Sequence, residues 1–176
     1  YVELLTEKDF MMSLGRTIII CIIPIFLTVL LVLLALFAVT IYFPKLEKYV
    51  QLICMIPYTI QGVILSVSII SLYAASPGVL GNRLVMLTGA YCIIILPYIY
   101  QGIRNSLYAV NTKTLLEAAS ILGANKFYGF LKIIVPTVLP GLMNTALISF
   151  SALFGDFAII KIIASSQYET VQTYLY

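Results

Sequence analysis

Charged residues are scarce in this chain. Of its 176 residues only 10% are Asp, Glu, Lys or Arg and 62% are hydrophobic, whereas a soluble domain has roughly 25% charged and about 45–50% apolar residues. So few charges cannot cover the surface of a soluble enzyme, and the high hydrophobicity excludes a disordered chain. The net charge of +3 comes from scattered basic residues, which form no nucleic-acid-binding footprint. Lipid is therefore the predicted solvent for most of the chain.

Histidine is absent, which removes the commonest metal ligand and the commonest general base. The three cysteines lie far apart inside apolar runs and form no C-x-x-C pair, so a disulfide framework or a zinc site is disfavoured. We interpret them as packing residues, and we assign no catalytic and no metal-binding residues. An intramembrane enzyme is disfavoured for the same reason. Tryptophan is also absent, and several of the 13 tyrosines lie near predicted helix ends as interfacial anchors.

Long stretches without charge are the strongest signal in the sequence. Four such stretches contain 28, 34, 20 and 23 residues and occupy 17–44, 49–82, 84–103 and 133–155. About 20 apolar residues in a helix cross a hydrocarbon core of about 30 Å, so each stretch fits one membrane helix. We predict helices at 15–43, 49–75, 84–108 and 130–155 in a single domain over 1–176. The fold class is an all-α membrane protein, a polytopic helical bundle. Since the chain begins with Tyr1, we expect it to be a fragment.

The basic residues indicate the orientation of these helices. Six of them fall on the side of the connection between the third and fourth helices, and four fall on the other side. The excess of Lys and Arg favours placing the first side in the cytoplasm.

The connection at 109–132 is too long and too ordered for a simple loop. Thr114 and Glu117 fit a capping box, and Gly123 supplies a helix stop. Between them, four apolar residues share one face by their spacing: Leu115, Leu116, Ala119 and Leu122. We therefore predict a short amphipathic helix at the cytoplasmic surface. It could lie in the lipid interface or insert its apolar face into a groove on a soluble partner.

A motif in this connection resembles that of a known family. Glu117-Ala118-Ala119 is followed by Gly123 after three residues, and then by Ile133, Val135 and Pro136. This resembles the EAA motif, E-A-A-x3-G-x9-I-x-L-P, of membrane subunits of binding-protein-dependent ABC importers. The chain departs from the pattern only at Val135, which replaces a leucine with another aliphatic residue.

The resemblance implies the MetI-like fold of type I importer permeases in a bacterial or archaeal plasma membrane. Such a subunit pairs with a second permease subunit and receives solute from an extracytoplasmic binding protein. Its cytoplasmic helix docks on a separate ATPase subunit, which uses ATP and Mg²⁺. This chain contains no G-x-x-x-x-G-K-[ST] phosphate loop, so no ATP site or other cofactor is expected on it. The region 147–157 is similar to the spermidine and putrescine branch, and related branches carry ferric iron, thiamine, phosphonate or sulfate.

The resemblance also implies which residues couple transport to ATP hydrolysis. They are Leu116, Glu117, Ala118, Ala119, Gly123, Ala124, Ile133 and Pro136. The alanines would allow close approach, although helix propensity alone also explains them. Glu117 would pair with a basic residue of the partner or act only as a cap.

Polar residues within the predicted membrane helices are candidates for the solute path, because such side chains usually face the bundle interior. We select Gln61, Ser68, Tyr98, Asn144, Ser149 and Asp156. Most polar residues of this kind only link helices by hydrogen bonds. Asp156 would steer a cationic solute or mark the water boundary. The alternative function is a secondary transporter or channel, which would need charges inside the helices for ion coupling, and the predicted helix cores contain none.

Overall fold

The computed structural model describes residues 8–60, 62–73, 81–156 and 158–163, and every regular element in these ranges is a helix. The elements in chain order are α2 (Lys8–Ile41), η1 (Pro44–Leu46), α3 (Glu47–Met55), η2 (Ile56–Thr59), α4 (Gly62–Tyr73), α5 (Arg83–Ala109), α6 (Thr112–Ile121), α7 (Lys126–Gly129), the π-helical turn η4 (Phe130–Ile134), α8 (Val135–Phe154) and α9 (Ala158–Ile163). The predicted all-α class is confirmed.

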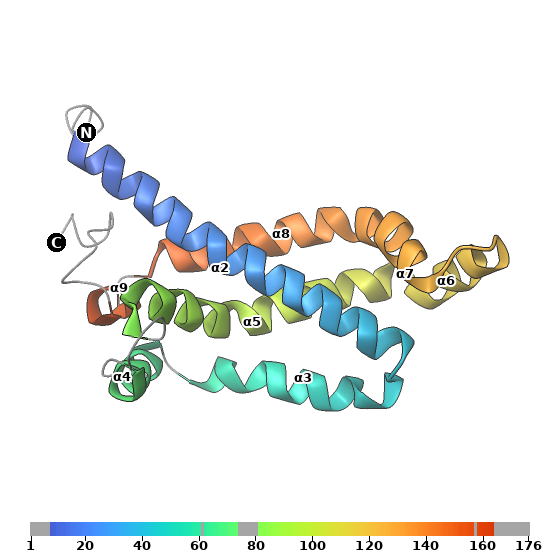
Figure 1. The fold of residues 1–176 in the computed structure, drawn as a ribbon, viewed down its shortest axis with the longest axis horizontal. Coiled ribbons are helices and arrows are strands. Elements are labelled where there is room, and N and C mark those ends of the chain that lie inside the picture. Colours follow the sequence, from blue (N-terminus) through green and yellow to red (C-terminus); the bar gives the residue numbers. More distant parts are fainter. Residues whose placement is uncertain (1–7, 61, 74–80, 157, 164–176) are drawn as a thin grey trace.

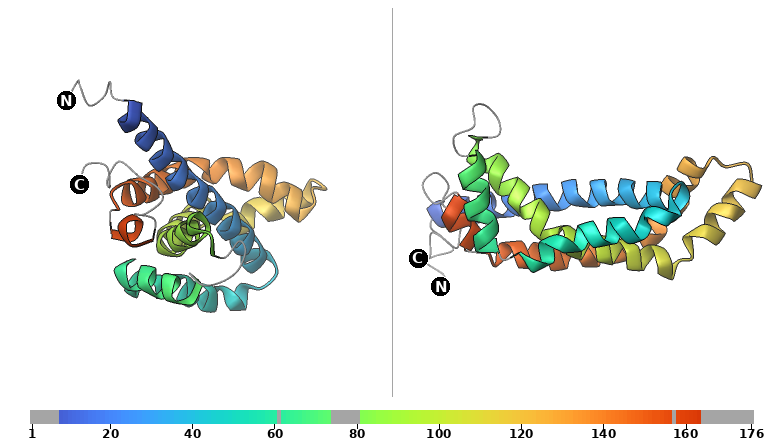
Figure 2. Two further views of the ribbon diagram at one scale, coloured as in Figure 1. Left: turned by 60° about the vertical axis from the view of Figure 1, so that its left-hand side comes forward. Right: turned by 90° about the horizontal axis from the view of Figure 1, so that it is seen from below.

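The long helices form an elongated bundle. Helices α2, α5 and α8 contact one another along the bundle, and α3 packs against α5 (Figure 1). Helices α4 and α9 contact each other at one end, whereas α6 and α7 project beyond the opposite end (Figures 1 and 2). The turn between α2 and α3 lies at the same end as α6.

Three helical stretches are long and apolar enough to cross a membrane: Phe10–Ile41, Arg83–Ala109 and Lys126–Phe154. They occupy the regions predicted as helices at 15–43, 84–108 and 130–155. A fourth crossing exists if the bent pair Pro44–Thr59 and Gly62–Tyr73 counts as one span. The chain is therefore a multi-pass membrane protein.

The prediction of one unbroken helix over 49–75 is wrong. Helix α3 ends at Met55, and the two parts of this region are bent by 96° relative to each other. Ile60 has an extended backbone (φ −95°, ψ 119°), and its N–H donates to the Pro57 carbonyl 3.1 Å away rather than to a helical i−4 partner. Pro57 supplies no N–H of its own, which helps to end the helix here.

The sequence also predicts a turn after this region, over Ser76-Pro77-Gly78 with Gly81-Asn82, and 76–78 lies outside the described residues. Asn82 does act at the end of that turn. Its side chain accepts a hydrogen bond of 2.9 Å from the Leu84 N–H and so caps the start of α5.

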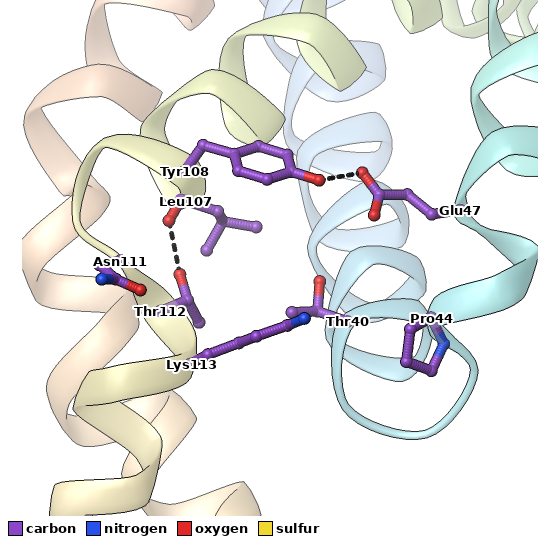
Figure 3. A pocket seen from close by; sticks show the side chains of 8 residues that line it. All are labelled: Thr40, Pro44, Glu47, Leu107, Tyr108, Asn111, Thr112 and Lys113. Carbon is purple, nitrogen blue, oxygen red and sulfur yellow. Dashed lines mark hydrogen bonds between the residues drawn. The ribbon is translucent and has the colours of Figure 1, made fainter.

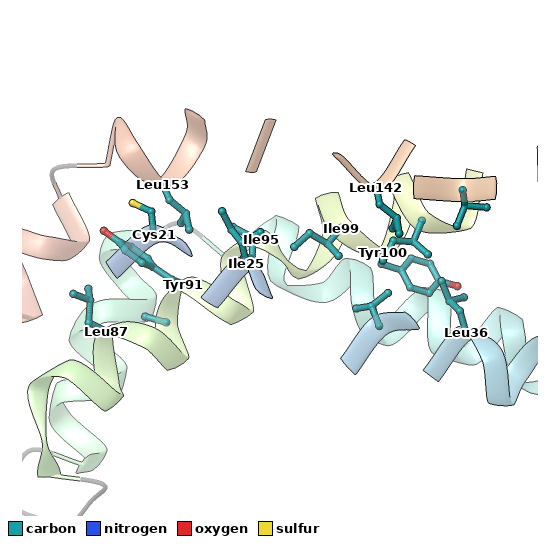
Figure 4. Packing of buried hydrophobic residues seen from close by; sticks show 14 of the residues in the cluster. Cys21, Ile25, Leu36, Leu87, Tyr91, Ile95, Ile99, Tyr100, Leu142 and Leu153 are labelled. Atoms are coloured by element: carbon teal, nitrogen blue, oxygen red, sulfur yellow. The ribbon is translucent and has the colours of Figure 1, made fainter. Parts of the chain in front are cut away.

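Helix α5 forms the centre of the hydrophobic core. Its buried side chains pack among those of α2 and α8 (Figure 4). Those with no more than 1% exposure are Leu87, Ala90, Tyr91, Ile95, Ile99, Tyr100 and Ile103. The same cluster includes Cys21, Ile25 and Leu36 of α2 and Leu142 and Leu153 of α8. The outer helices instead expose apolar side chains, such as Phe26 at 71%, which lipid tolerates and water does not.

Candidate functional site

Helix α6 and the turn that follows it form the part of the described chain that extends beyond the bundle (Figure 1). This is the region that carries the EAA-like motif. Its polar connections to the bundle run through the end of α5, where Thr112 Oγ1 donates a 2.7 Å hydrogen bond to the Leu107 carbonyl. The amphipathic helix expected from the sequence therefore exists, and it starts directly at the end of a long helix.

The predicted capping box is wrong. Helix α6 begins at Thr112 with Asn111 as its N-cap, so Thr114 is the third residue of the helix and Glu117 the sixth, and neither is in a capping-box position. The preceding residue, Asn111, has a left-handed backbone (φ 48°, ψ 59°), a conformation that Asn adopts more readily than most residues. This residue forms the turn through which α6 leaves the end of α5. The interpretation of Glu117 as only a cap is excluded, because the side chain is exposed in the middle of the helix.

The predicted stop at Gly123 is confirmed. Gly123 has a φ of +82°, which an L side chain rarely adopts. Its N–H donates to the Ser120 carbonyl, and the Ala124 N–H donates to the Ala119 carbonyl, each at 3.0 Å. These two bonds form a Schellman motif, which satisfies carbonyls at the helix end.

The two faces of α6 differ from the prediction in one respect. Leu115 and Leu116 are half-buried and Ala119 is buried, but Leu122 is 86% exposed and Ile121 is 85% exposed. Ala119 faces the return segment: a Cβ on Gly129 would lie 3.3 Å from the Ala119 Cβ and from Leu116 Cδ2. Ala119 therefore allows α6 to pack closely against Gly129 of the same chain. The free face carries Glu117, Ala118 and the two exposed apolar side chains.

The last part of the motif lies at the start of α8. The Val135 N–H donates to the Phe130 carbonyl five residues earlier, which makes the π-helical turn η4. Pro136 follows directly, in the first turn of α8, where a missing N–H is tolerated. Ile133 and Pro136 are exposed, whereas Phe130 and Ile134 are buried. The Phe130 ring packs on Phe37 with centroids 4.7 Å apart, so the return segment is held against the end of α2.

A polar hollow lies between α3, η2, α5 and α8. Its volume is about 670 Å³, and its larger polar lining residues are Gln51, Tyr58, Tyr98, Gln101, Asn105 and Asn144. The Tyr58 and Tyr98 rings meet edge to face with centroids 6.1 Å apart. None of the described side chains that line it carries a formal charge.

The structure brings only two of the predicted solute-path residues to this hollow, Tyr98 and Asn144. Ser68 is exposed on α4 and donates to the Ile64 carbonyl at 2.8 Å. Ser149 is fully buried in α8 and does not line the hollow. Gln61 lies outside the described residues. Ser68 and Ser149, predicted for the solute path, therefore do not line this hollow, because their helices turn these side chains elsewhere.

Asp156 also lies away from the hollow, just beyond α8. Its Oδ2 accepts hydrogen bonds from the Ile159 N–H at 3.2 Å and from Tyr91 Oη at 3.4 Å. Burial raises the pKa of the Asp156 carboxyl above its ordinary value, although both hydrogen bonds act in the opposite direction. The described contacts thus give Asp156 a role in holding α9 beside α5.

The selected candidates leave out four of the six larger polar lining residues of the hollow, and one ion pair was not predicted from the sequence. For the hollow, the sequence does contain a signal, because Tyr98, Gln101 and Asn105 recur at helical spacing and so share one face of α5. The ion pair joins Arg104 Nε to Glu47 Oε1 at 3.0 Å and links α5 to α3. The sequence contains no local signal for this pair, since the two residues are 57 positions apart.

A smaller pocket of about 170 Å³ lies beside this ion pair (Figure 3). It is lined by Thr40, Pro44, Glu47, Leu107, Tyr108, Asn111, Thr112 and Lys113. The pocket separates the turn after α2 from the start of α6. Tyr108 reaches across it from α5 and donates a hydrogen bond to Glu47 (Figure 3).

Comparison with known proteins adds a family match. Residues 13–175 match the family described as "Binding-protein-dependent transport system inner membrane component". The match covers nearly all of the chain, including the bundle, the hollow and α6.

Three curated relatives also match. The diacetylchitobiose uptake system permease protein DasC of Streptomyces coelicolor is 32% identical over 82 residues, 47% of this chain and 29% of that protein. The probable sulfate transport system permease protein cysT of Prototheca wickerhamii is 25% identical over 138 residues, 73% of this chain and 54% of that protein. The molybdenum transport system permease protein ModB of Azotobacter vinelandii is 30% identical over 78 residues, 44% of this chain and 34% of that protein. The matches span about half or less of the length of these relatives.

Proposed function

Because the chain belongs to the family of binding-protein-dependent transport system inner membrane components, we propose that it is a permease subunit of an ATP-driven importer. In this proposal the bundle forms part of the solute path, and α6 couples it to a separate ATPase subunit. A second permease subunit completes the path, and a binding protein delivers the solute from outside the cell. The membrane is the plasma membrane of a bacterium or archaeon.

One observation carries the coupling role. Helix α6 projects from the end of the bundle with Glu117, Ala118, Ile121 and Leu122 exposed on it. Exposed apolar side chains on a helix that leaves the membrane-spanning bundle favour a protein partner, since burial of such surface drives association. Glu117 would add an ion pair with a basic residue of that partner. ATP and Mg²⁺ would bind to the partner, and this chain would hold no cofactor.

The rigid connection between α6 and α5 gives the proposal a mechanism. For ATP binding to drive transport, the two packings of the permease must differ in how well α6 fits the ATPase subunit. The Thr112–Leu107 hydrogen bond and the turn at Asn111 join α6 to the central helix of the bundle. A displacement of α6 would therefore move α5, which lines the hollow.

The identity of the transported solute is a separate question. The resemblance of 147–157 favours a polyamine, and related branches carry ferric iron, thiamine, phosphonate or sulfate. The names of the three relatives refer to a chitobiose derivative, sulfate and molybdenum, so sulfate is common to both sets and a polyamine is not. Among the described lining residues of the hollow there is no carboxylate that would pair with a polyamine. We therefore propose transport by this subunit without assigning the polyamine to it.

The alternative of a secondary transporter or channel gains no support from the described helices. Ion coupling needs charged side chains that face the path inside the membrane. Glu47 and Arg104 are the two opposite charges in the candidate spans that the structure pairs with each other, and neither lines the polar hollow.

The test is capture of the ATPase subunit by the complete permease. A tagged permease should copurify with a protein that contains a phosphate loop. Glu117→Ala and Leu122→Ser should each weaken this association about tenfold, which corresponds to about 1.4 kcal/mol, with unchanged membrane insertion.

The matched control is Leu147→Ser, which removes another exposed leucine, from α8 instead of α6. It should leave the association unchanged. If no ATPase subunit binds the wild-type permease, the proposed function is wrong. If the subunit binds all variants equally, the docking role of α6 is wrong.

A further inference from the structure

Three side chains close a small cluster between the start of α3 and the end of α5. Glu47 Oε1 accepts hydrogen bonds from Arg104 Nε at 3.0 Å and from Tyr108 Oη. The Arg104 guanidinium also lies over the Tyr108 ring, 4.8 Å from its centroid. Each member therefore contacts the other two. We call these three residues the Glu47 cluster.

The cluster matters for α3 because this helix has little other anchorage. Helix α3 contains no buried residue. Its half-buried residues Val50, Cys54 and Met55 pack against the core, and the rest of its apolar surface is exposed. Such packing leaves a helix free to slide or rotate, because apolar contact has no preferred direction. The hydrogen bonds of Glu47 do have a preferred direction, so they fix where α3 begins against α5.

Helix α3 is also a wall of the polar hollow. Gln51 and Met55 line the hollow, and they follow Glu47 at intervals of four residues. This spacing places the three residues on one face of the helix. The position of Glu47 therefore sets the position of the two side chains that α3 contributes to the hollow.

On its other side the Glu47 cluster adjoins the start of α6. Tyr108 is four residues before Thr112, the first residue of α6, and its carbonyl accepts a 3.1 Å hydrogen bond from the Asn111 N–H. The Thr112–Leu107 hydrogen bond closes the same turn. A short and fully bonded segment thus connects α6 with the residue that holds Glu47.

The simplest alternative is an ordinary surface ion pair. The Arg104 and Glu47 side chains are 24% and 28% exposed, and exposed pairs contribute only about 0–1 kcal/mol to stability. A small contribution to stability is compatible with a large effect on position when a helix such as α3, which has no buried residue, is held mainly by non-directional apolar contacts. The convergence of a third group, Tyr108, on the same two side chains favours this role.

We propose that Glu47, Arg104 and Tyr108 are positioning residues that tie the α3 wall of the hollow to the junction of α5 and α6. When the ATPase subunit displaces α6, the wall moves with it as one body. This inference rests on the proposed function, because it assigns the route by which α6 reaches the hollow.

The experiment measures the distance between α3 and α6 directly. Spin labels are placed at Lys48→Cys and Thr114→Cys, two exposed positions, in the complete permease with Cys54 and Cys92 replaced by alanine. Pulsed electron paramagnetic resonance gives the distance distribution in lipid nanodiscs, without nucleotide and, with the ATPase subunit bound, after trapping with ATP and vanadate. The original cluster should give one narrow distribution that is the same in both states.

Glu47→Ala should at least double the width of the distribution without nucleotide and shift its centre after trapping. The charge-swapped pair Glu47→Arg with Arg104→Glu should restore most of the narrow distribution. Lys45→Ala is the matched control, because it removes a charge from the same turn and should change neither quantity. A purely stabilising role would leave the nucleotide-dependent shift at zero in all variants.

Equal widths for the original protein and Glu47→Ala without nucleotide would overturn the inference, and so would a distance that changes on trapping while the cluster is intact. Absence of a bound ATPase subunit would instead overturn the proposed function. The comparison without nucleotide needs no partner, so it decides in that case too whether the cluster fixes α3.

Discussion

Single small residues decide how closely the two central helices approach each other. Gly102 of α5 faces Thr145 of α8, and Gly141 of α8 faces Ser106 of α5; a Cβ on either glycine would overlap the facing side chain. The two hydroxyls donate to the Gly102 and Gly141 carbonyls within their own helices, at 2.8 and 2.9 Å. The close contact therefore leaves no hydroxyl unpaired, as expected for packing between membrane helices.

Gly102→Ala should destabilise the bundle by about 1–3 kcal/mol, the usual cost of added volume in a packed interior. The thermal midpoint in detergent measures this loss. Gly89→Ala is the matched control, because a Cβ there meets nothing within 4 Å. The double variant Gly102→Ala with Thr145→Ala should be more stable than Gly102→Ala alone. Equal midpoints for Gly102→Ala and Gly89→Ala would show that the two helices separate at no cost.

At the scale of elements, α6 is defined by its two ends and by the segment that returns from it. Asn111 forms the turn before it, Gly123 ends it, and Gly129 packs against Ala119 on its inner face. The π-helical turn then leads into α8 with Phe130 packed on Phe37. These contacts therefore fix the position of α6 relative to the bundle and leave its outer face exposed.

Gly123→Ala should loosen the last turn of α6. A Cβ at this residue would meet nothing within 4 Å. The cost of the substitution therefore comes from the φ of +82° and amounts to about 1–2 kcal/mol. Amide hydrogen exchange at residues 123 and 124 should accelerate accordingly. Gly123→Asn should have a smaller effect, because Asn tolerates this conformation. Gly15→Ala, at a helical position with open space, should not accelerate exchange at α6. Unchanged exchange in Gly123→Ala would contradict the role of the Schellman motif.

At the scale of the whole molecule, the bundle has two different ends. One end carries α6, the turn after α2 and the Glu47 cluster, and the other carries α4 and α9 (Figures 1 and 2). The excess of basic residues lies toward the α6 end, which favours the cytoplasm for that end. The bent pair of α3 and α4 runs from the first end toward the second.

Cysteines introduced at the two ends should react with a membrane-impermeant maleimide from opposite sides. Ser120→Cys in α6 should react in inverted vesicles only, whereas Gly155→Cys and Tyr73→Cys should react in intact cells only. All three positions are exposed, so burial does not limit the reaction. The control is the chain in which Cys54 and Cys92 are replaced by alanine and no cysteine is introduced. If Ser120→Cys and Gly155→Cys are labelled from the same side of the membrane, the topology is contradicted. If Tyr73→Cys is labelled from the same side as Ser120→Cys, the bent pair does not cross the membrane.

Several elements could be predicted because their signals are local. The charge-free stretches indicate α2, α5 and α8, and Gly123 marks the end of α6. The start of α6 could not be predicted, because Thr114 and Glu117 fit a cap as well as a helix interior. The break at Ile60 was missed for a similar reason: an apolar run with Pro57 resembles a kinked helix as much as an interrupted one.

The sequence by itself determined that this protein is a helical membrane bundle with a short amphipathic helix outside it, since charge content and spacing act on each segment independently. Only the tertiary structure decided which polar side chains share the hollow, that Ala119 faces inward while Leu122 faces outward, and that Arg104 meets Glu47. These outcomes depend on how helices rotate and approach one another. That rotation is set by contacts between residues far apart in the chain, such as Gly102 and Thr145, which no local pattern encodes.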